Sequence, residues 1–355
     1  MYAVIMAGGA GTRLWPISRE ARPKQLHALV TNKPMIRETV DRLVPLVSLE
    51  DVFVITSAAH RAQVCELLAD VPSENIVGEP FPLGTMLAVG LAAVMVAKRD
   101  PQATMLVAWS DSHISEPENY FASLLLASRA CQVADGVIIG VKPTFPATGY
   151  GYILMGDEVV ELHPERVYWI DRFIEKPDLE TAKRFVRRWG YLWNPGISVW
   201  RVDKLLGLYK RLRPRDYEAL MAVQPYLNTP EQNDAIAREL GSLEKIAIDY
   251  AIYEKAERLA VVPADLGWSD IGTWASLKDA LENNCGTNYV RGEHVGLFTE
   301  NCLVLGHDRL IATLGVSDLV IVDAGDCILV AHRDRSQEVK DLVELLRKCG
   351  KEQYL

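Results

Sequence analysis

Short apolar runs alternate with amphipathic segments along the first third of the chain. The apolar runs have the length of buried strands, and turn-forming residues separate them from segments with helical spacing. Alternation of this kind predicts a parallel sheet with helices on both faces. The predicted strands are 2–7, 52–56, 75–78 and 104–109. The predicted helices are 36–46, 59–70, 86–98 and 117–134.

The pattern changes in the middle of the chain, where apolar runs follow one another closely. We expect the sheet to become mixed here and its added strands to cover one side of a cleft. The predicted strands of this part begin at Val137, Tyr152 and Val167. Helical spacing then returns at 203–212, 215–225 and 230–240.

After residue 283 the chain carries short β-runs at nearly even spacing, separated by polar turns. Runs this short and regular favour a small parallel β-solenoid over a sheet that carries helices. We therefore expect two domains, 1–283 and 284–355, the second ending in a helix over 336–348. Because so short a solenoid is poorly insulated alone, it should pack on the first domain or on a second subunit.

Composition and charge exclude several classes of function. The chain has 355 residues and a net charge of −9, whereas a nucleic-acid or membrane-surface binder needs a positive footprint. No apolar run is long enough to span a membrane, and the N-terminus begins with a strand where a signal peptide would have a charged region. The cysteines form no C-x-x-C pair. We expect free thiols in a reducing cytoplasm.

The first predicted strand leads into a glycine-rich turn and then into a cationic loop. Gly8, Gly9 and Gly11 precede Thr12, and their missing side chains let backbone N–H groups approach a ligand closely. The cations that follow are Arg13, Arg19, Arg22 and Lys24. Backbone donors beside fixed positive charge are what a polyphosphate needs. An ordinary turn of an α/β protein explains the glycines alone equally well.

Two well-known phosphate loops do not fit this stretch. Thr12 and Arg13 follow Gly11, where the G-x-x-x-x-G-K-[ST] loop needs Lys and then Ser or Thr. Leu14 stands where the G-x-G-x-x-G fingerprint needs its third glycine. The stretch therefore predicts a phosphate site of another type.

Polar residues also follow other predicted strands. Asp111 comes after the run 104–109, and a carboxylate at the end of a buried strand is costly unless it is solvated, paired or bound to a metal. Instead of binding a ligand, Asp111 could cap the helix that follows it. The same alternative holds for Thr85, which follows Gly84. His113 has no Cys or His partner at the spacing of a zinc site, so we expect it to be polar lining.

The string F-I-E-K-P ends a predicted strand with two opposite charges. Glu175 and Lys176 would point to opposite faces of a regular strand, but Pro177 ends the pairing and lets both side chains turn the same way. The carboxylate suits sugar hydroxyls and the ammonium suits a phosphate. An exposed ion pair of little energetic value is the alternative reading of these residues.

Three strings together identify a family resemblance. G-G-x-G-T-R-L-x-P, followed by P-K-Q, resembles the signature of sugar-nucleotide pyrophosphorylases, and Trp15 with 18–20 narrows it to mannose-1-phosphate guanylyltransferases. F-I-E-K-P and G-W-S-D-I-G occur in the same order as in that family. The resemblance implies an α/β Rossmann-like nucleotidyltransferase domain with a mixed, mainly parallel sheet. A small left-handed parallel β-helix segment would follow it.

The resemblance also implies roles for residues. Lys24 and Arg13 would hold the pyrophosphate beside the backbone of Gly8, Gly9, Gly11 and Thr12, with Lys176 as a further catalytic residue. Asp111 and Asp270 would bind Mg²⁺, although Asp270 alone could equally be a turn residue that caps a helix. The sugar-binding residues would be Gly149, Tyr150, Glu175, Lys176 and Asn194. The residues that lie beside the nucleobase would be Gly84 and Thr85. Asp249 is expected mainly to N-cap a helix, with a weaker role in lining the sugar site.

The implied reaction joins α-D-mannose 1-phosphate to GTP, giving GDP-mannose and pyrophosphate, in a homodimer. Two alternatives stay open. Leu83–Met86 and Pro195 depart from the family pattern, so another nucleoside triphosphate or hexose 1-phosphate could be the substrate. The second alternative is a catalytically silent relative that binds a nucleotide sugar and regulates a partner. The five charged residues Arg13, Lys24, Asp111, Lys176 and Asp270 argue against it, because a silent protein has no physical need for all of them.

Overall fold

The computed structural model describes residues 1–9, 11–282 and 286–355. Compactness divides the chain into two units, which we call unit 1 and unit 2. Unit 1 is Met1–Gly8, Thr39–Ser110 and Ile114–Trp268. Unit 2 is Gly9–Glu38, Asp111–His113 and Ser269–Leu355. The domain boundary expected after residue 283 falls outside the described residues and stays a prediction.

Unit 1 is built on a ten-stranded sheet in the order β11-β8-β7-β9-β6-β10-β4-β1-β2-β3, with β11 also paired to β6. The strands β3, β2, β1 and β4 are parallel, and β10 is antiparallel to β4 and to β6. The expected mixed character of the sheet is confirmed. Its strands are β1 Tyr2–Ala7, β2 Val52–Ser57, β3 Ile76–Glu79, β4 Thr104–Trp109, β6 Gly136–Val141, β7 Gly151–Glu158, β8 Tyr168–Glu175, β9 Tyr191–Asn194, β10 Ser198–Arg201 and β11 Leu259–Ala264.

The first four strands of this sheet lie within a residue or two of their predicted bounds, but β9, β10 and β11 were not predicted. β9 and β10 have four residues each and are separated by a Pro-Gly turn, so neither is long enough to show a strand period. β11 pairs with both β6 and β8, and this closes the part of the sheet that carries β7 and β9. Strand formation here depends on pairing partners that are distant in sequence.

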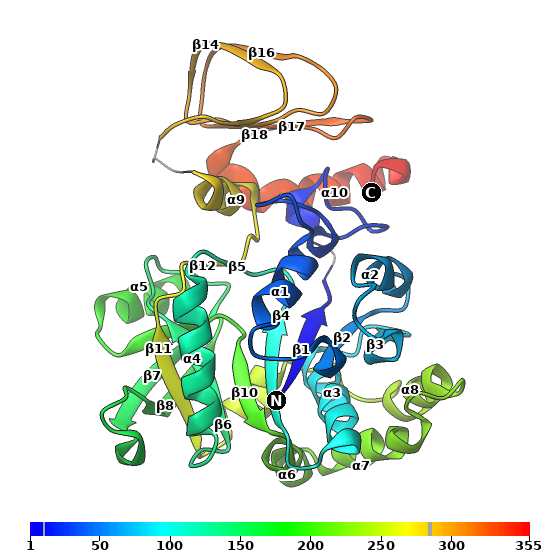
Figure 1. Cartoon of the computed structure of the whole chain (residues 1–355). Helices are drawn as coiled ribbons and strands as arrows, with labels where there is room; N and C mark the ends of the chain where they lie inside the picture. The colour runs from blue at the N-terminus through cyan, green and yellow to red at the C-terminus, as the bar shows by residue number, and fades with distance from the viewer. Residues whose placement is uncertain (10, 283–285) are drawn as a thin grey trace. The chain divides into compact units, whose positions relative to one another are not determined.

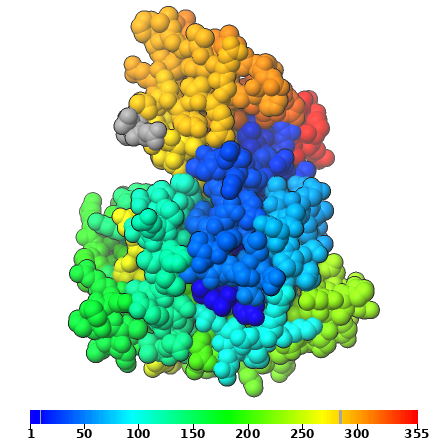
Figure 2. Space-filling view, in the orientation of Figure 1, coloured from blue at the N-terminus to red at the C-terminus, as the bar shows by residue number. Residues whose placement is uncertain are grey.

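Helices cover the sheet of unit 1. α4 contacts β6, β10 and β11 and lies across them, and it forms part of the visible surface of the unit (Figures 1 and 2). α3 contacts β1, β2 and β4 and is itself covered by α6 and α7. The helices are α1 Met35–Leu43, which begins in unit 2, α2 Arg61–Leu67, α3 Thr85–Arg99, α4 Pro117–Ala130, α5 Leu179–Arg187, α6 Val202–Leu212, α7 Pro214–Val223 and α8 Gln232–Leu240.

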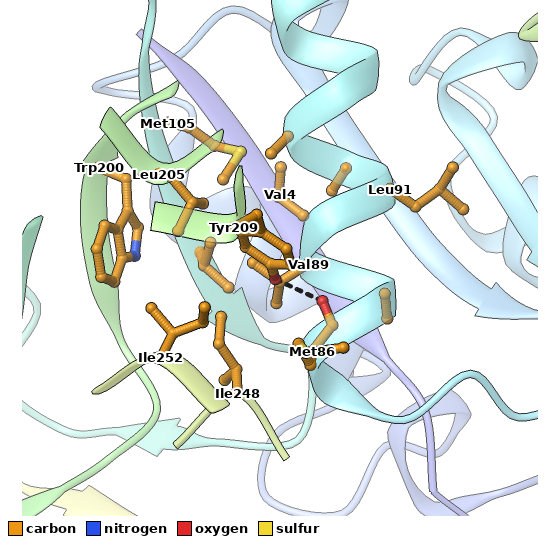
Figure 3. Packing of buried hydrophobic residues seen from close by; sticks show 14 of the residues in the cluster. Val4, Met86, Val89, Leu91, Met105, Trp200, Leu205, Tyr209, Ile248 and Ile252 are labelled. Carbon is orange, nitrogen blue, oxygen red and sulfur yellow. Dashed lines mark hydrogen bonds between the residues drawn. The ribbon is translucent and has the colours of Figure 1, made fainter. Parts of the chain in front are cut away.

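The core of unit 1 is centred on α3. Every residue from Met86 to Val96 is buried, as expected for a helix that is apolar all round. Tyr209 of α6 packs on it, and its hydroxyl donates a hydrogen bond to the Met86 carbonyl (Figure 3). Among the described residues no helix has the length and apolar character needed to cross a membrane.

Unit 2 contains the C-terminal β-coils. β13, β15 and β17 form one parallel ladder and β14 pairs with β16 in another, which confirms the expected solenoid pattern. β18 is antiparallel to β17, so the expectation of a wholly parallel solenoid is wrong for its last strand. The remaining elements are β5 His113–Ile114, β12 Trp268–Ser269, α9 Trp274–Leu281, β13 Tyr289–Arg291, β14 His294–Glu300, β15 Leu303–Leu305, β16 Ile311–Ser317, β17 Leu319–Asp323, β18 Ile328–His332 and α10 Val339–Lys348.

The loop that follows β1 belongs to unit 2 because it packs on these C-terminal elements. Leu14 and Trp15 are buried in one apolar cluster with Trp274 of α9 and with residues of the β-coils. The Trp274 indole donates to the Trp15 carbonyl (3.0 Å), and the Trp15 indole donates to the Tyr354 carbonyl (2.7 Å). The predicted phosphate loop is therefore held in place by the last quarter of the chain.

Candidate active site

An ammonium group surrounded by oxygens is the centre of the site in unit 2. Lys24 Nζ lies 3.0 Å from a carboxylate oxygen of Asp111. It also donates to the backbone carbonyls of Asp270 (3.0 Å) and Ile271 (3.3 Å). The side chains of Lys24 and Asp111 are only 12% and 26% exposed. Three segments that are far apart in sequence, all singled out from their motifs, thus meet at one cation.

Local backbone geometry brings Lys24 to this point. Pro23 has an extended conformation and precedes a single 3-10 turn, Lys24–Leu26. Gly11 has φ of +59°, and a β-carbon there would lie 2.6 Å from Ser18 Oγ and 2.9 Å from Lys24 Cγ. Glycine is therefore required at position 11 both for its backbone conformation and for the close passage of the lysine stem.

The rest of the phosphate loop is open to solvent. Gly9 has φ of +93° and is exposed, and a β-carbon on Gly8 or Gly9 would meet nothing within 4 Å. Arg13 is exposed in the 3-10 turn Thr12–Leu14, and it forms no hydrogen bond or ion pair within the described part of the chain. An uncommitted guanidinium beside accessible backbone is available to an anion.

Asp270 lies in a turn whose backbone is strained. Its Oδ1 accepts a hydrogen bond from the Gly272 N–H (3.1 Å). Ile271, a buried β-branched residue, has φ of +42°, which such residues rarely adopt. In this turn two consecutive backbone carbonyls, those of Asp270 and Ile271, accept hydrogen bonds from Lys24 Nζ. Strain of this kind is often found at functional sites.

The alternative reading of Asp270 as a helix cap does not hold. α9 is capped by Thr273, whose hydroxyl accepts from the Ser276 N–H (3.1 Å) while Ser276 Oγ accepts from the Thr273 N–H (3.0 Å). This reciprocal pair completes the cap. The Asp270 carboxylate is therefore not needed to start α9.

The donors in this part of unit 2 suit a hard divalent cation. Asp111 and Asp270 supply carboxylates, and the groups around Lys24 Nζ are all oxygens. Among the described residues no group of three or more His, Cys, Asp or Glu side chains forms a metal-binding cluster. Mg²⁺ is commonly bound by one or two carboxylates with phosphate and water oxygens, so two aspartates fit it.

A second polar cluster lies in unit 1, at the end of β8. Lys176 Nζ lies 2.7 Å from Glu175 Oε1, so the side chains of these consecutive residues converge. The reason is the backbone of Lys176, which leaves the strand with φ of +47°. The Glu175 side chain is 8% exposed and that of Lys176 is 56% exposed. Although burial lowers the pKa of Lys176, its hydrogen bond to Glu175 and the charges of Glu175 and Asp249 leave it raised.

Asn194 and Asp249 extend this cluster. Asn194, at the end of β9, donates from Nδ2 to Asp249 Oδ1 (3.1 Å) and accepts at Oδ1 from the Gly196 N–H (2.9 Å). Burial, with the neighbouring charge of Glu175, raises the pKa of Asp249 to about 6. The cluster thus holds two carboxylates, an amide and an ammonium in one place, which suits a ligand with both hydroxyl and phosphate groups.

The expected role of Asp249 as a helix cap is wrong. Asp249 lies inside a π-helical turn, Asp249–Tyr253, which Ile248 precedes, and no side-chain hydrogen bond caps this turn. π-Turns are rare and occur frequently at functional sites. The sequence signal for Asp249 was present but weak, because its partner Asn194 is 55 residues away.

The turn before β7 lies beside Glu175. The Tyr150 carbonyl accepts from the Lys176 N–H (3.2 Å), and a β-carbon on Gly151 would lie 2.6 Å from Glu175 Oε2. A β-carbon on Gly149 would face open space. The Tyr150 ring packs edge-on against the rings of Trp193 and Trp268, with centroids 5.2 Å apart in each pair. The aromatic groups thus support the turn that was predicted to contact a sugar.

The loop between β3 and α3 is joined to the same part of unit 1. Gly84, with φ of +79°, is the N-cap of α3, so the expected cap at Thr85 is wrong by one residue. The Thr85 hydroxyl instead accepts from the Ile248 N–H (2.9 Å), and the Met86 N–H donates to the Ile246 carbonyl (3.2 Å). The segment 246–249 therefore contacts the predicted base loop through Ile246 and Ile248, and it contacts Asn194 through Asp249.

Comparisons with known proteins agree with these motifs. A family model described as nucleotidyl transferase matches residues 2–285, and one described as MannoseP isomerase/GMP-like beta-helix domain matches residues 292–346. The chain is 34% identical to the mannose-1-phosphate guanylyltransferase of Escherichia coli K12, over 100% of this chain and 75% of that protein. It is also 34% identical to the alginate biosynthesis protein AlgA of Pseudomonas fluorescens, over 99% of this chain and 73% of that protein.

A solved structure is similar over nearly the whole length. It is the crystal structure described as mannose-1-phosphate geranyltransferase from Thermus thermophilus, with a TM-score of 0.86 and 33% sequence identity. The match covers 98% of this chain and 99% of that chain. Both the α/β part and the β-coils are thus found together in one known architecture.

Proposed function

The chain belongs to the nucleotidyl transferase family, among its mannose-1-phosphate guanylyltransferases, and from this premise we propose how its residues form GDP-mannose from GTP and mannose 1-phosphate. The convergence of Lys24, Asp111 and the Asp270 turn is the observation that carries the proposal. These are the charges that a nucleoside triphosphate needs around its phosphates.

The phosphate loop holds the part of GTP that leaves as pyrophosphate. The exposed Arg13 guanidinium and the N–H groups of Gly9, Gly11 and Thr12 face negative oxygens, with Gly8 giving the backbone room to approach. Lys24 adds a second cation that is already fixed by its contact with Asp111. Fixed charges stabilise the transition state without having to reorganise during the reaction.

Divalent cations generally support nucleotidyl transfer, and we propose Mg²⁺ held by Asp111 and Asp270. When bound, the ion neutralises triphosphate oxygens as charge moves toward the departing pyrophosphate. The hydrogen bond from Gly272 orients the Asp270 carboxylate before any ligand arrives. The second oxygen of that carboxylate is left for the ion.

The cluster at the end of β8 binds the sugar phosphate. The exposed Lys176 ammonium meets the phosphate, while the buried Glu175 accepts from sugar hydroxyls. Asn194, the backbone of Gly149 and the Tyr150 turn complete the sugar contacts. We add Asp249 to this set, because it is held by Asn194 and lies beside both charges.

The chemistry needs no protein nucleophile. A phosphate oxygen of mannose 1-phosphate attacks the α-phosphorus of GTP, a new P–O bond forms, and the bond to the bridging oxygen of pyrophosphate breaks. That phosphate oxygen already carries negative charge, so no proton has to be removed from it. Position and electrostatics therefore supply most of the rate enhancement.

Pyrophosphate release tests this function directly. The purified chain is assayed with each of GTP, ATP, UTP and dTTP against mannose, glucose and galactose 1-phosphates. GTP with mannose 1-phosphate should be the preferred pair, and Lys24→Met serves as the matched inactive control. Preference for another pair would identify that nucleoside triphosphate and sugar 1-phosphate as the substrates. No pyrophosphate release with any pair would support the alternative of a catalytically silent relative. Homodimer formation and a cytoplasmic location stay predictions, to be checked by light scattering and cell fractionation.

A further inference from the structure

A pocket in unit 1 shares no residue with the sites proposed above. It has a volume of about 220 Å³ and is lined by Phe53, Met95, Lys98, Arg99, Leu227 and Asn228. It lies at the start of β2 and at the last turn of α3. The predicted base loop is at the other end of α3, a helix of 15 residues and therefore about 22 Å long. The pocket is thus distinct from the place where the base of a nucleotide substrate is expected.

Two cations line this pocket without a counter-charge. Lys98 Nζ donates to the Leu227 carbonyl (2.8 Å). The Arg99 guanidinium donates to the Glu50 carbonyl (2.8 Å) and to the side-chain oxygen of Asn75. These acceptors are all neutral, and neither cation forms an ion pair with a described residue. The bonds leave most N–H donors of both groups unused, so the positive charge is available to an anion.

The carboxylates near this end of α3 do not neutralise the two cations. Burial and the charges of Asp51 and Asp100 raise the pKa of Tyr2, and the charge of Arg99 opposes them. Neither carboxylate pairs with Lys98 or Arg99, although both lie in this part of unit 1. The dipole of a helix favours cations in its last turn, but it does not require a pocket beside them.

Apolar groups form the walls of the pocket. The side chains of Phe53, Met95 and Leu227 are buried. The Arg99 guanidinium lies over the Phe53 ring, with its Cζ 4.6 Å from the ring centroid. Guanidinium groups stack on flat rings as well as binding phosphate. An inorganic anion would gain nothing from such walls, whereas a flat apolar ring would be removed from water.

Asn228 adds an amide to the rim of the pocket. Its backbone has φ of +66°, and its N–H donates to the Gln232 side chain (2.9 Å). These features fix the position of the residue. The side-chain amide forms no hydrogen bond within the described part of the chain, so it can donate to a phosphate oxygen.

We propose that this pocket binds a phosphate monoester that carries a flat ring, as a nucleoside monophosphate does. Lys98 and Asn228 contact the phosphate, and the ring lies against Met95 and the Arg99 guanidinium. Sites for drug-sized ligands have volumes from about 300 Å³ upward, so the smaller volume here limits the occupant to one ring with its phosphate. The site is additional to the substrate sites and does not depend on the proposed reaction.

The methyl group of Met95 reports on this pocket in NMR. The chain has 8 methionines, so labelling their methyl groups with ¹³C gives a simple spectrum. Met95→Leu, which nearly conserves side-chain volume, assigns the signal. The full-length chain is titrated with guanosine monophosphate (GMP), phenyl phosphate, ribose 5-phosphate and guanosine. The Met95 signal separates binding in this pocket from binding at the GTP site.

GMP and phenyl phosphate should shift the Met95 signal saturably, because each has both a ring and a phosphate. Ribose 5-phosphate lacks the ring and guanosine lacks the phosphate, so each should bind about 10-fold more weakly or worse. Tighter binding of GMP than of phenyl phosphate supports a nucleotide as the natural ligand, and equal affinity supports a simpler aryl phosphate. The absence of a saturable shift with either compound overturns the inference, and so does ribose 5-phosphate binding as tightly as GMP.

Asn228→Asp places a carboxylate beside the phosphate at nearly constant volume, and Asp tolerates a positive φ. It should weaken GMP binding at the Met95 signal by about 5- to 100-fold. Asn233→Asp is the matched control, because Asn233 is exposed on α8 and does not line the pocket, and it should bind GMP as wild type does. Lys98→Met keeps the apolar stem and should cause a similar loss. Wild-type affinity in both Asn228→Asp and Lys98→Met contradicts the proposal.

Discussion

Replacing Glu79, the last residue of β3, by Gln should stabilise the protein above neutral pH, because burial penalises the charged form of this carboxyl. In the folded chain the pKa of this carboxyl is about 7, against an ordinary value of 4.5. Because the folded-state pKa is the raised one, the stabilising contribution of the protonated group is complete below pH 4.5 and is lost as the pH rises to about 7. The shift corresponds to about 3 kcal/mol, and residual contact with solvent reduces the expected change to about 2 kcal/mol.

Urea denaturation followed by tryptophan fluorescence measures this effect at several values between pH 4.5 and 8. The difference in unfolding free energy between Glu79→Gln and wild type should grow with pH by about 2 kcal/mol and level off above pH 7. Glu74→Gln, whose side chain is in solvent, should follow the wild-type profile. A constant difference between Glu79→Gln and wild type across this range would refute the argument that Glu79 is held as a costly, uncompensated carboxylate.

Three further outcomes are expected. Lys24→Met should lower kcat by about 10²- to 10³-fold with an unchanged circular dichroism spectrum, because the fixed charge on the leaving pyrophosphate is lost; a wild-type rate contradicts this role. Asp270→Asn should raise the Mg²⁺ concentration for half-maximal rate by about 10-fold, and an unchanged Mg²⁺ titration removes the residue from the metal site. For Asp249, with a pKa of about 6, KM for mannose 1-phosphate should rise as the pH falls through 6 and acceptor capacity is lost. Asp249→Asn should abolish this pH dependence, and a variant that retains it assigns the titration to another group.

Much of unit 1 was predicted from hydrophobic periodicity because its first strands are continuous apolar runs. β1, β2 and β4 each have four or five buried residues in a row, and α3 carries a longer buried run. The four-residue strands β9 and β10 have no comparable local signal, and β11 was missed although it is a six-residue run. The antiparallel pairing of β18 was also missed, since even spacing of runs predicts their presence and not their direction.

The motifs predicted which residues belong to the site better than they predicted the contacts between those residues. The contact of Lys24 with Asp111 joins residues that each stood out by their own string. Asp249 was assigned mainly to a helix cap, because local spacing offers that role first and its contact with Asn194 is remote in sequence. Glu79 lies in the segment 78–85, which follows a predicted strand, but no motif marked its carboxylate, because its raised pKa depends on burial in the folded chain.

By itself the sequence determined which residue types were available: glycines that free the phosphate loop, the cations beside them, and carboxylates at strand ends. Those properties are local, because they depend on side-chain chemistry and on distances of a few residues along the chain. Tertiary structure alone decided that the Asp270 turn offers carbonyls to Lys24, that Lys176 turns back on Glu175, and that Glu79 is half-buried beside the Leu83 N–H. Contacts and burial of this kind come from segments many residues apart, and their energies depend on distance and solvent exposure in the folded chain.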